Sequence, residues 1–263
     1  MNADRIRQRA AELLQGHALR QPFMPFNADA ALPSLSAAYA VQRCYMATLA
    51  GQLNTTIAGY KIGLTSPRMQ AMCGINSPIA GRVLATRLLA DGVVLRRADY
   101  GHLGIEFEIG VRMARDMPAH AAPHGVAAVA AAVGAITPAV ELVDDRNAAY
   151  QGLDMASLVA DNAWNAGVIL GAWVTVWPAL GAVTGVVYRN GLELDRGHGR
   201  DVLGHPFHAL TWLANHLAIS GEGLRAGDVV ATGSIVPTRF PNGPETYRYT
   251  LEALGEVGFS IVD

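Results

Sequence analysis

An apolar run from Gly104 to Gly110 contains two glutamates, Glu106 and Glu108, that stand two positions apart. Side chains alternate between the faces of a β-strand, so both carboxylates project from one face and their apolar neighbours from the other. Burying two like charges is costly. A hard divalent cation such as Mg²⁺, which binds carboxylate oxygens, removes that cost. The alternative is a solvent-facing strand edge with two charged residues.

Two further charged side chains lie among apolar neighbours. Glu141 is embedded in the apolar segment 138–146, and this second carboxylate favours the cation site over the exposed edge. Lys61 stands between Tyr60 and Ile62. Its ammonium either extends to solvent or points into a polar cavity, where desolvation can lower its pKa and suit it to acid–base chemistry.

Composition limits the class of protein. A content of 51% hydrophobic and 16% charged residues indicates a well-buried globular chain. The net charge of −2 gives no electrostatic reason to expect binding to nucleic acid or to an anionic membrane. The two cysteines, Cys44 and Cys73, suit a reducing cytosol, and the N-terminus lacks the apolar core of a signal peptide. We therefore expect a cytoplasmic protein without a membrane span.

The hydrophobic pattern predicts an α+β fold with an N-terminal helical segment over residues 1–55 and a strand-rich domain over 56–263. The N-terminal helices are expected over 3–15, ending at Gly16, and from Ser34 or Ser36 to about Leu49. Further helices are expected from Pro67 to Gly74, over 126–133 and from Pro206 to near Gly221. A strand-rich stretch is expected over 79–113. Further strands are expected at 57–66, within the Glu141 segment 138–146, and at 168–170, 182–194, 228–234 and 245–262, with an Asn190–Gly191 hairpin turn.

Several segments, taken together, resemble one family. They are Gly59-Tyr60-Lys61-Ile62-Gly63-Leu64-Thr65-Ser66, Glu106-Phe107-Glu108, residues 139–146, Asp161-Asn162-Ala163, and Trp212-Leu213-Ala214-Asn215 followed by Gly227-Asp228. In this order and spacing they are similar to the 2-keto-4-pentenoate hydratase / 4-oxalocrotonate decarboxylase family, within the fumarylacetoacetase superfamily. The resemblance runs from about residue 40 to the C-terminus.

The resemblance implies a fold and a site. The fold is a mixed β-sandwich or roll of the fumarylacetoacetase C-terminal type. The implied cofactor is Mg²⁺ or Mn²⁺ held by Glu106, Glu108 and Glu141, and Lys61 corresponds to the family's active-site lysine. The resemblance also assigns substrate contacts to four residues: Leu64, Asn162, Asn165 and Ser234.

The implied substrate is a small 2-oxo or 2-hydroxy-dienoic acid, whose enolate charge a cation on the 2-oxygen stabilises. The first activity to consider is hydration of a 2-hydroxy-2,4-dienoate to a 4-hydroxy-2-oxo acid in aromatic meta-cleavage catabolism, favoured by residues 212–215. The second is decarboxylation of a 4-oxalocrotonate-type acid, favoured by residues 203–206. A third is a weakly active partner subunit of a hydratase–decarboxylase complex, and a weaker fourth is acylpyruvate hydrolysis. A homo-oligomer is also expected.

Some positions depart from the family pattern. Asn76 and Ile79 stand where hydratases carry acidic residues, and Trp164-Asn165 replaces a serine-rich stretch. His102 begins the segment where Pro-Arg is common, and it is a candidate proton shuttle or an ordinary structural histidine. The pair Asp144-Asp145 is expected either to orient the site or to pair with Arg146. The metal site is thus predicted to be intact while the substrate shell is altered.

Overall fold

The computed structural model describes residues 1–26, 31–72 and 74–263, so Cys73 lies outside the described residues. The helices are α1 (Ala3–Ala18), α2 (Leu35–Gln52), α3 (Pro67–Met72), α4 (Val126–Ala132), α5 (Met155–Ala160) and α6 (Pro206–Ile219). The strands are β1 (Ile57–Gly63), β2 (Ile79–Leu84), β3 (Leu88–Ala90), β4 (Val94–Arg96), β5 (Leu103–Met113), β6 (Val133–Asp144), β7 (Asn165–Leu170), β8 (Thr184–Arg189), β9 (Leu192–His198), β10 (Val229–Ser234), β11 (Glu245–Leu251) and β12 (Gly255–Val262).

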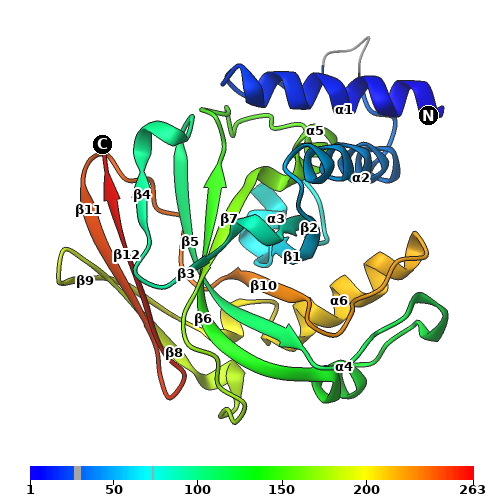
Figure 1. Ribbon diagram of the computed structural model, residues 1–263. Coiled ribbons are helices and arrows are strands. Elements are labelled where there is room, and N and C mark those ends of the chain that lie inside the picture. Colours follow the sequence, from blue (N-terminus) through cyan, green and yellow to red (C-terminus); the bar gives the residue numbers. More distant parts are fainter. Residues whose placement is uncertain (27–30, 73) are drawn as a thin grey trace.

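Two sheets form the body of the protein (Figure 1). The larger has the order β2-β1-β10-β5-β6-β7-β3, and the smaller has the order β4-β12-β11-β8-β9. The pairs β1–β10, β3–β7 and β4–β12 are parallel, whereas the remaining pairs are antiparallel. Strands and helices do not alternate regularly, which confirms the predicted α+β class with mixed sheets.

The two faces of β5 have different surroundings, as the alternation of its residues predicts. Ile105, Phe107 and Ile109 are fully buried in the main hydrophobic core. The ring of Phe107 lies 5.4 Å from that of Tyr249 on β11, so this face packs against the smaller sheet. Glu106 and Glu108 consequently project from the opposite face of the larger sheet.

The N-terminal helices pack on the larger sheet's side of the molecule (Figure 1). Ser34 caps α2 by accepting a hydrogen bond from the amide of Ala37, as predicted from its position before the helix. The buried amide of Gln42 donates to the carbonyl oxygens of Ala80 (2.9 Å) and Val159 (2.8 Å). Helix α2 is thereby joined to β2 and α5, while a domain boundary after residue 55 stays a prediction.

Several element boundaries differ from the sequence prediction. Helix α1 continues through Gly16 to Ala18, and Gly16 is buried close to Arg146 rather than ending the helix. Gly134 already belongs to β6, and β7 begins at Asn165 instead of 168. At Gly16, packing overrode a local stop signal. Among the described residues, no helix combines the length and the hydrophobicity that crossing a bilayer requires.

Candidate metal centre

Three carboxylates from two adjacent strands meet on one face of the larger sheet. Glu106 on β5 stands directly opposite Glu141 on β6, and Glu108 projects from the same face as Glu106. Their ligand oxygens all lie within 4.8 Å of one another. Glu108 and Glu141 are fully buried, and Glu106 is half-buried. The cluster is therefore internal, and the solvent-facing strand edge is excluded.

A protein donor orients each of the three carboxylates. The hydroxyl of Thr238 donates to Oε1 of Glu106 (2.5 Å), and the amide of Gly233 donates to Oε2 of Glu108 (2.7 Å). The side-chain amide of Asn165 donates to Oε1 of Glu141 (3.0 Å). Donors of this kind fix the orientation of metal-binding carboxylates.

Two of the carboxylate oxygens are buried without a partner. Oε1 of Glu108 and Oε2 of Glu141 make no hydrogen bond within the described part of the chain. Buried polar atoms are rarely left unsatisfied, because the desolvation cost is then uncompensated. Both oxygens are free to bind an ion, so these residues fit a hard divalent cation.

Lys61 belongs to the same buried cluster. Its Nζ lies 3.0 Å from Oε1 of Glu141, and the side chain is only 4% exposed. Lys61 does not extend to solvent, so that alternative is wrong. Burial lowers the pKa of the Lys61 ammonium, but the carboxylates of Glu141, Glu106 and Glu108 outweigh it and the pKa is raised. The lowered pKa considered from the sequence is therefore also wrong.

The charge balance of the cluster is unfavourable by itself. One ammonium faces three carboxylates, which leaves two negative charges uncompensated. Burial, followed by the neighbouring charges of Glu141 and Glu106, raises the pKa of Glu108 well above its usual range. Burial also raises the pKa of Glu141, although Lys61 opposes the shift. A bound divalent cation would neutralise the cluster and allow all three carboxylates to be ionised.

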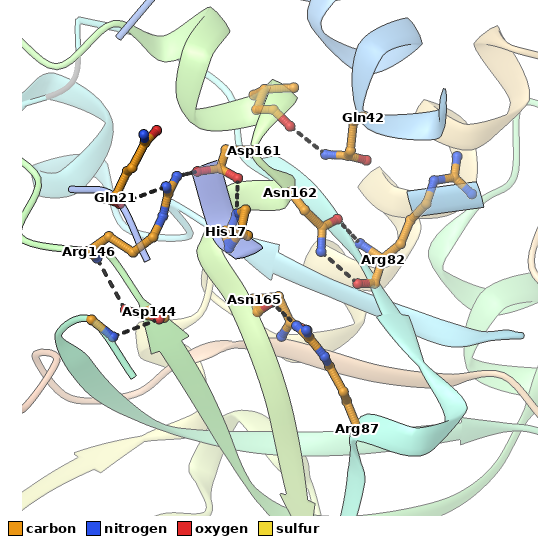
Figure 2. Close-up of polar contacts among 12 residues, drawn as sticks. His17, Gln21, Gln42, Arg82, Arg87, Asp144, Arg146, Asp161, Asn162 and Asn165 are labelled. Carbon is orange, nitrogen blue, oxygen red and sulfur yellow. Dashed lines mark hydrogen bonds and ion pairs between the residues drawn. The ribbon is translucent and has the colours of Figure 1, made fainter. Parts of the chain in front are cut away.

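A left-handed turn before β7 positions Asn165. Asn162, Ala163 and Trp164 have φ values of 54°, 47° and 59°, a conformation that costs about 1–2 kcal/mol for each non-glycine residue. Asn162 accepts from the amide of Arg82 (2.7 Å) and donates to its carbonyl oxygen (2.9 Å), as Figure 2 shows. The amide of Asn162 is therefore bound to β2, whereas that of Asn165 is directed to Glu141.

The residue before this turn, Asp161, is held from two sides (Figure 2). Its Oδ1 lies 2.6 Å from Nε2 of His17 on α1, and its Oδ2 forms an ion pair with Arg146. Pairing with Arg146 was one of the two alternatives for Asp144-Asp145, and the structure shows that the Arg146 guanidinium pairs with Asp161 instead. Asp144 accepts from the backbone amides of Gly101 and His102.

The other residues that were predicted to contact substrate or carry a proton lie in different surroundings. Leu64, at φ 56°, is partly buried in the core beside the N-terminal helices. The Ser234 hydroxyl accepts from the amide of Phe107 (3.1 Å) and donates to the carbonyl of Val236 (2.7 Å), so it links β10 to β5. Nδ1 of His102 lies 2.7 Å from Oδ1 of Asp145. The proton-shuttle alternative for His102 remains a prediction.

Three substituted positions of the predicted substrate shell also have defined surroundings. Ile79 is buried, and Asn76 is exposed. Neither carries the acid that the resemblance leads one to expect there. Trp164 is buried edge-on against Phe23 (5.1 Å) and Tyr150 (5.8 Å). The indole thus packs in the hydrophobic cluster that includes residues of the N-terminal helices.

A cavity of about 290 Å³ lies beside Asn165, and Arg87 and Arg146 are among the residues that line it. A larger and more open hollow of about 600 Å³ lies beyond the far end of β5, around Asp116 and Arg225. Of these two, the smaller cavity is lined by a residue, Asn165, that donates a hydrogen bond to the acidic cluster.

Sequence reasoning missed several residues that support the centre. Thr238 and His17 are far from the glutamates in sequence and carry no local signal. Gly233, in contrast, carried a local signal, because Thr232-Gly233-Ser234 ends a strand with a turn pattern. Its φ is 117°, and a Cβ there would lie 2.3 Å from Oγ1 of Thr65. Only glycine fits this backbone conformation and this close approach.

Comparison with known proteins identifies the family of the chain and related structures. Residues 82–262 match the fumarylacetoacetate (FAA) hydrolase C-terminal family. A 2-keto-4-pentenoate hydratase of Paraburkholderia phymatum is 31% identical over 97% of this chain and 96% of its own length. A 4-oxalocrotonate decarboxylase of Pseudomonas sp. strain CF600 is 35% identical over 73% of this chain and 74% of its own. The structure of a 4-oxalocrotonate decarboxylase from Pseudomonas putida G7, complexed with magnesium and adipate, covers the whole chain and 99% of its own with a TM-score of 0.91 at 27% identity.

Proposed function

Because the chain belongs to the fumarylacetoacetate hydrolase C-terminal family, in the group of these hydratases and decarboxylases, we propose that it is a divalent-metal-dependent lyase. Its reaction adds water to a 2-hydroxy-2,4-dienoate, in its 2-oxo-4-enoate form, to give a 4-hydroxy-2-oxo acid in aromatic meta-cleavage catabolism. The observation that carries the proposal is the pair of buried, unpartnered oxygens on Glu108 and Glu141. Hydratase relatives that align along nearly the whole chain support the reaction.

The proposed cofactor is Mg²⁺, with Mn²⁺ as the second choice. Solved relatives are complexed with magnesium and with calcium, and an all-carboxylate donor set suits hard cations. Glu106, Glu108 and Glu141 would hold the ion. When bound, it supplies positive charge that stabilises a developing enolate on a 2-oxo acid.

Each remaining residue of the centre has a role that its contacts support. Asn165 and Gly233 orient Glu141 and Glu108 so that one oxygen of each is free. The Lys61 ammonium holds a proton at Nζ, 3.0 Å from Glu141, where it can protonate the substrate or contact its carboxylate. The buried surroundings exclude bulk water and strengthen these electrostatic effects.

Decarboxylation of a 4-oxalocrotonate-type acid is the second candidate. It is favoured by the structural likeness to a decarboxylase over the whole chain. It is also favoured by Asn76 and Ile79, which supply no acid to position an attacking water. A weakly active partner subunit of a hydratase–decarboxylase complex, a homo-oligomeric state and a cytoplasmic location are kept as further proposals.

The test is an ultraviolet assay of the purified protein with Mg²⁺ or Mn²⁺. For a hydratase, the dienol absorbance of 2-hydroxypenta-2,4-dienoate is lost, a 4-hydroxy-2-oxo acid accumulates and no CO₂ is released. For a decarboxylase, 4-oxalocrotonate releases CO₂ in proportion to its loss. Turnover that is unaffected by a chelator, or the absence of both reactions, contradicts the proposal.

A further inference from the structure

The cavity beside Asn165 is connected to the acidic cluster through that residue. Asn165 takes part in both places, because its side chain donates to Glu141 and the residue lines the cavity. The volume of about 290 Å³ is near the lower end of the range for small-molecule sites. It is therefore large enough for part of a small organic acid.

The cavity contains a cation whose charge is not compensated. Arg87 makes no ion pair with any carboxylate in the described ranges, and the hydrogen bond found for its guanidinium is to the backbone oxygen of Asn165 (3.3 Å). Arg146 also lines the cavity, but its charge is used by Asp161. Asp144 is satisfied by backbone amides. Asp99 is exposed at the surface, whereas Arg87 is half-buried.

Asn165 connects Arg87 to the metal centre. Its side-chain amide contacts Glu141 and its backbone oxygen contacts Arg87, as Figure 2 shows for the Arg87 side. The left-handed turn at residues 162–164 fixes the backbone that places both contacts. A guanidinium at this position is preorganised to receive an anion, because its planar donors match a carboxylate in pairs.

We propose that this cavity is a subsite for the far end of the substrate and that Arg87 binds a second carboxylate there. The enzyme then prefers dicarboxylic 2-oxo acids to monocarboxylic ones. This inference rests on the proposed function for the site at which the first carboxylate binds. It adds a residue that determines specificity and a substrate class that either candidate reaction can use.

The test compares two substrates and three variants, with Mg²⁺ present throughout. The value of kcat/KM is measured for a 2-hydroxy-dienoate with a distal carboxylate and for 2-hydroxypenta-2,4-dienoate. Calorimetry then compares the binding of adipate with that of hexanoate, which has the same number of carbons but a single carboxylate. The variants are Arg87→Gln, the conservative Arg87→Lys and the matched control Arg112→Gln. The control removes an exposed arginine that stacks on Trp173.

We expect the dicarboxylate to be preferred by the wild-type protein in both measurements. A charge-assisted hydrogen bond predicts a preference of roughly 10- to 100-fold. Arg87→Gln should remove most of this preference, Arg87→Lys should restore part of it, and Arg112→Gln should leave it unchanged. Equal use of the two acids by the wild-type protein, or a preference that persists in Arg87→Gln, overturns the subsite.

The design separates this inference from the proposed function. If the proposed function is wrong, the protein turns over neither substrate. The adipate–hexanoate comparison then decides the subsite alone, because it needs binding and no reaction. If Arg87→Gln does not fold, Arg87→Lys and the wild-type binding preference provide the same decision.

Discussion

Nε2 of His17 lies 2.6 Å from Oδ1 of Asp161, so the first helix is bonded to the segment that carries Asn165 to the metal centre. Arg146 occupies the other oxygen of the same carboxylate. Asp161 is only 1% exposed, so its carboxylate is stabilised by contacts with these two partners instead of by water. The N-terminal helices therefore support the candidate site through Asp161, and none of their described residues belongs to the acidic cluster.

Replacing Asp161 by alanine should destabilise the protein strongly. The buried Arg146 guanidinium would lose its ion-pair partner, and breaking a buried pair costs about 3–5 kcal/mol. Urea unfolding followed by circular dichroism measures the loss. As a control, Asp4→Ala removes an exposed ion pair with Arg7 and should change stability little. Similar stability of the two variants would show that the buried network is not structurally important.

Glu108→Gln should abolish the effect of Mg²⁺ on stability. In the wild-type protein, binding of Mg²⁺ at 100 times its dissociation constant should add about 2.7 kcal/mol to the free energy of unfolding. The variant retains a shape that can accept from Gly233 but lacks one buried negative charge. Thermal unfolding with and without a chelator gives both values.

The control for this measurement is Glu252→Gln, an exposed glutamate, which should keep the full Mg²⁺ effect. Without metal, Glu108→Gln should be at least as stable as the wild-type protein, because burial already raises the pKa of Glu108 and favours its neutral form. An undiminished Mg²⁺ effect in Glu108→Gln would exclude the cluster as the binding site.

The sequence predicted the acidic strands well because their information is local. Alternation along β5 places Glu106 and Glu108 on one face whatever the strand packs against. The supporting residues were less predictable, since Thr238 contacts Glu106 across 132 positions of sequence. Asn162 shows a different limit. The sequence shows an Asp-Asn-Ala-Trp-Asn stretch, but only the left-handed turn decides that Asn162 binds β2.

Lys61→Met should lower kcat by about 10²- to 10⁴-fold, the usual contribution of one positioned proton donor. Methionine fills most of the lysine volume but has no ionisable group that could donate a proton. The affinity for Mg²⁺ should be retained or increased, because the variant removes a positive charge beside Glu141. Steady-state kinetics and a Mg²⁺ titration monitored by thermal unfolding separate the two effects.

Lys61 is the only lysine among the 20 lysine and arginine residues of the chain. A lysine-selective acylating reagent therefore reports on one side chain and the N-terminus. Acylation of Lys61 should be slow in the folded protein and rapid in urea, since the side chain is 4% exposed.

In the kinetic experiment, a normal kcat for Lys61→Met would assign this lysine to charge compensation alone.

Asn162→Ala should mainly reduce stability, whereas Asn165→Ala should mainly weaken metal binding. Asn165 orients a carboxylate of the metal centre, and loss of such a support typically weakens metal binding 10- to 100-fold. Asn162 makes two buried hydrogen bonds to the backbone of Arg82, so its loss should reduce stability by about 1–3 kcal/mol for each group left unpaired. Its effect on Mg²⁺ affinity should be smaller. Mg²⁺ titration and urea unfolding of both variants test the contrast, and a raised KM with normal stability in Asn162→Ala would instead assign this side chain to substrate binding.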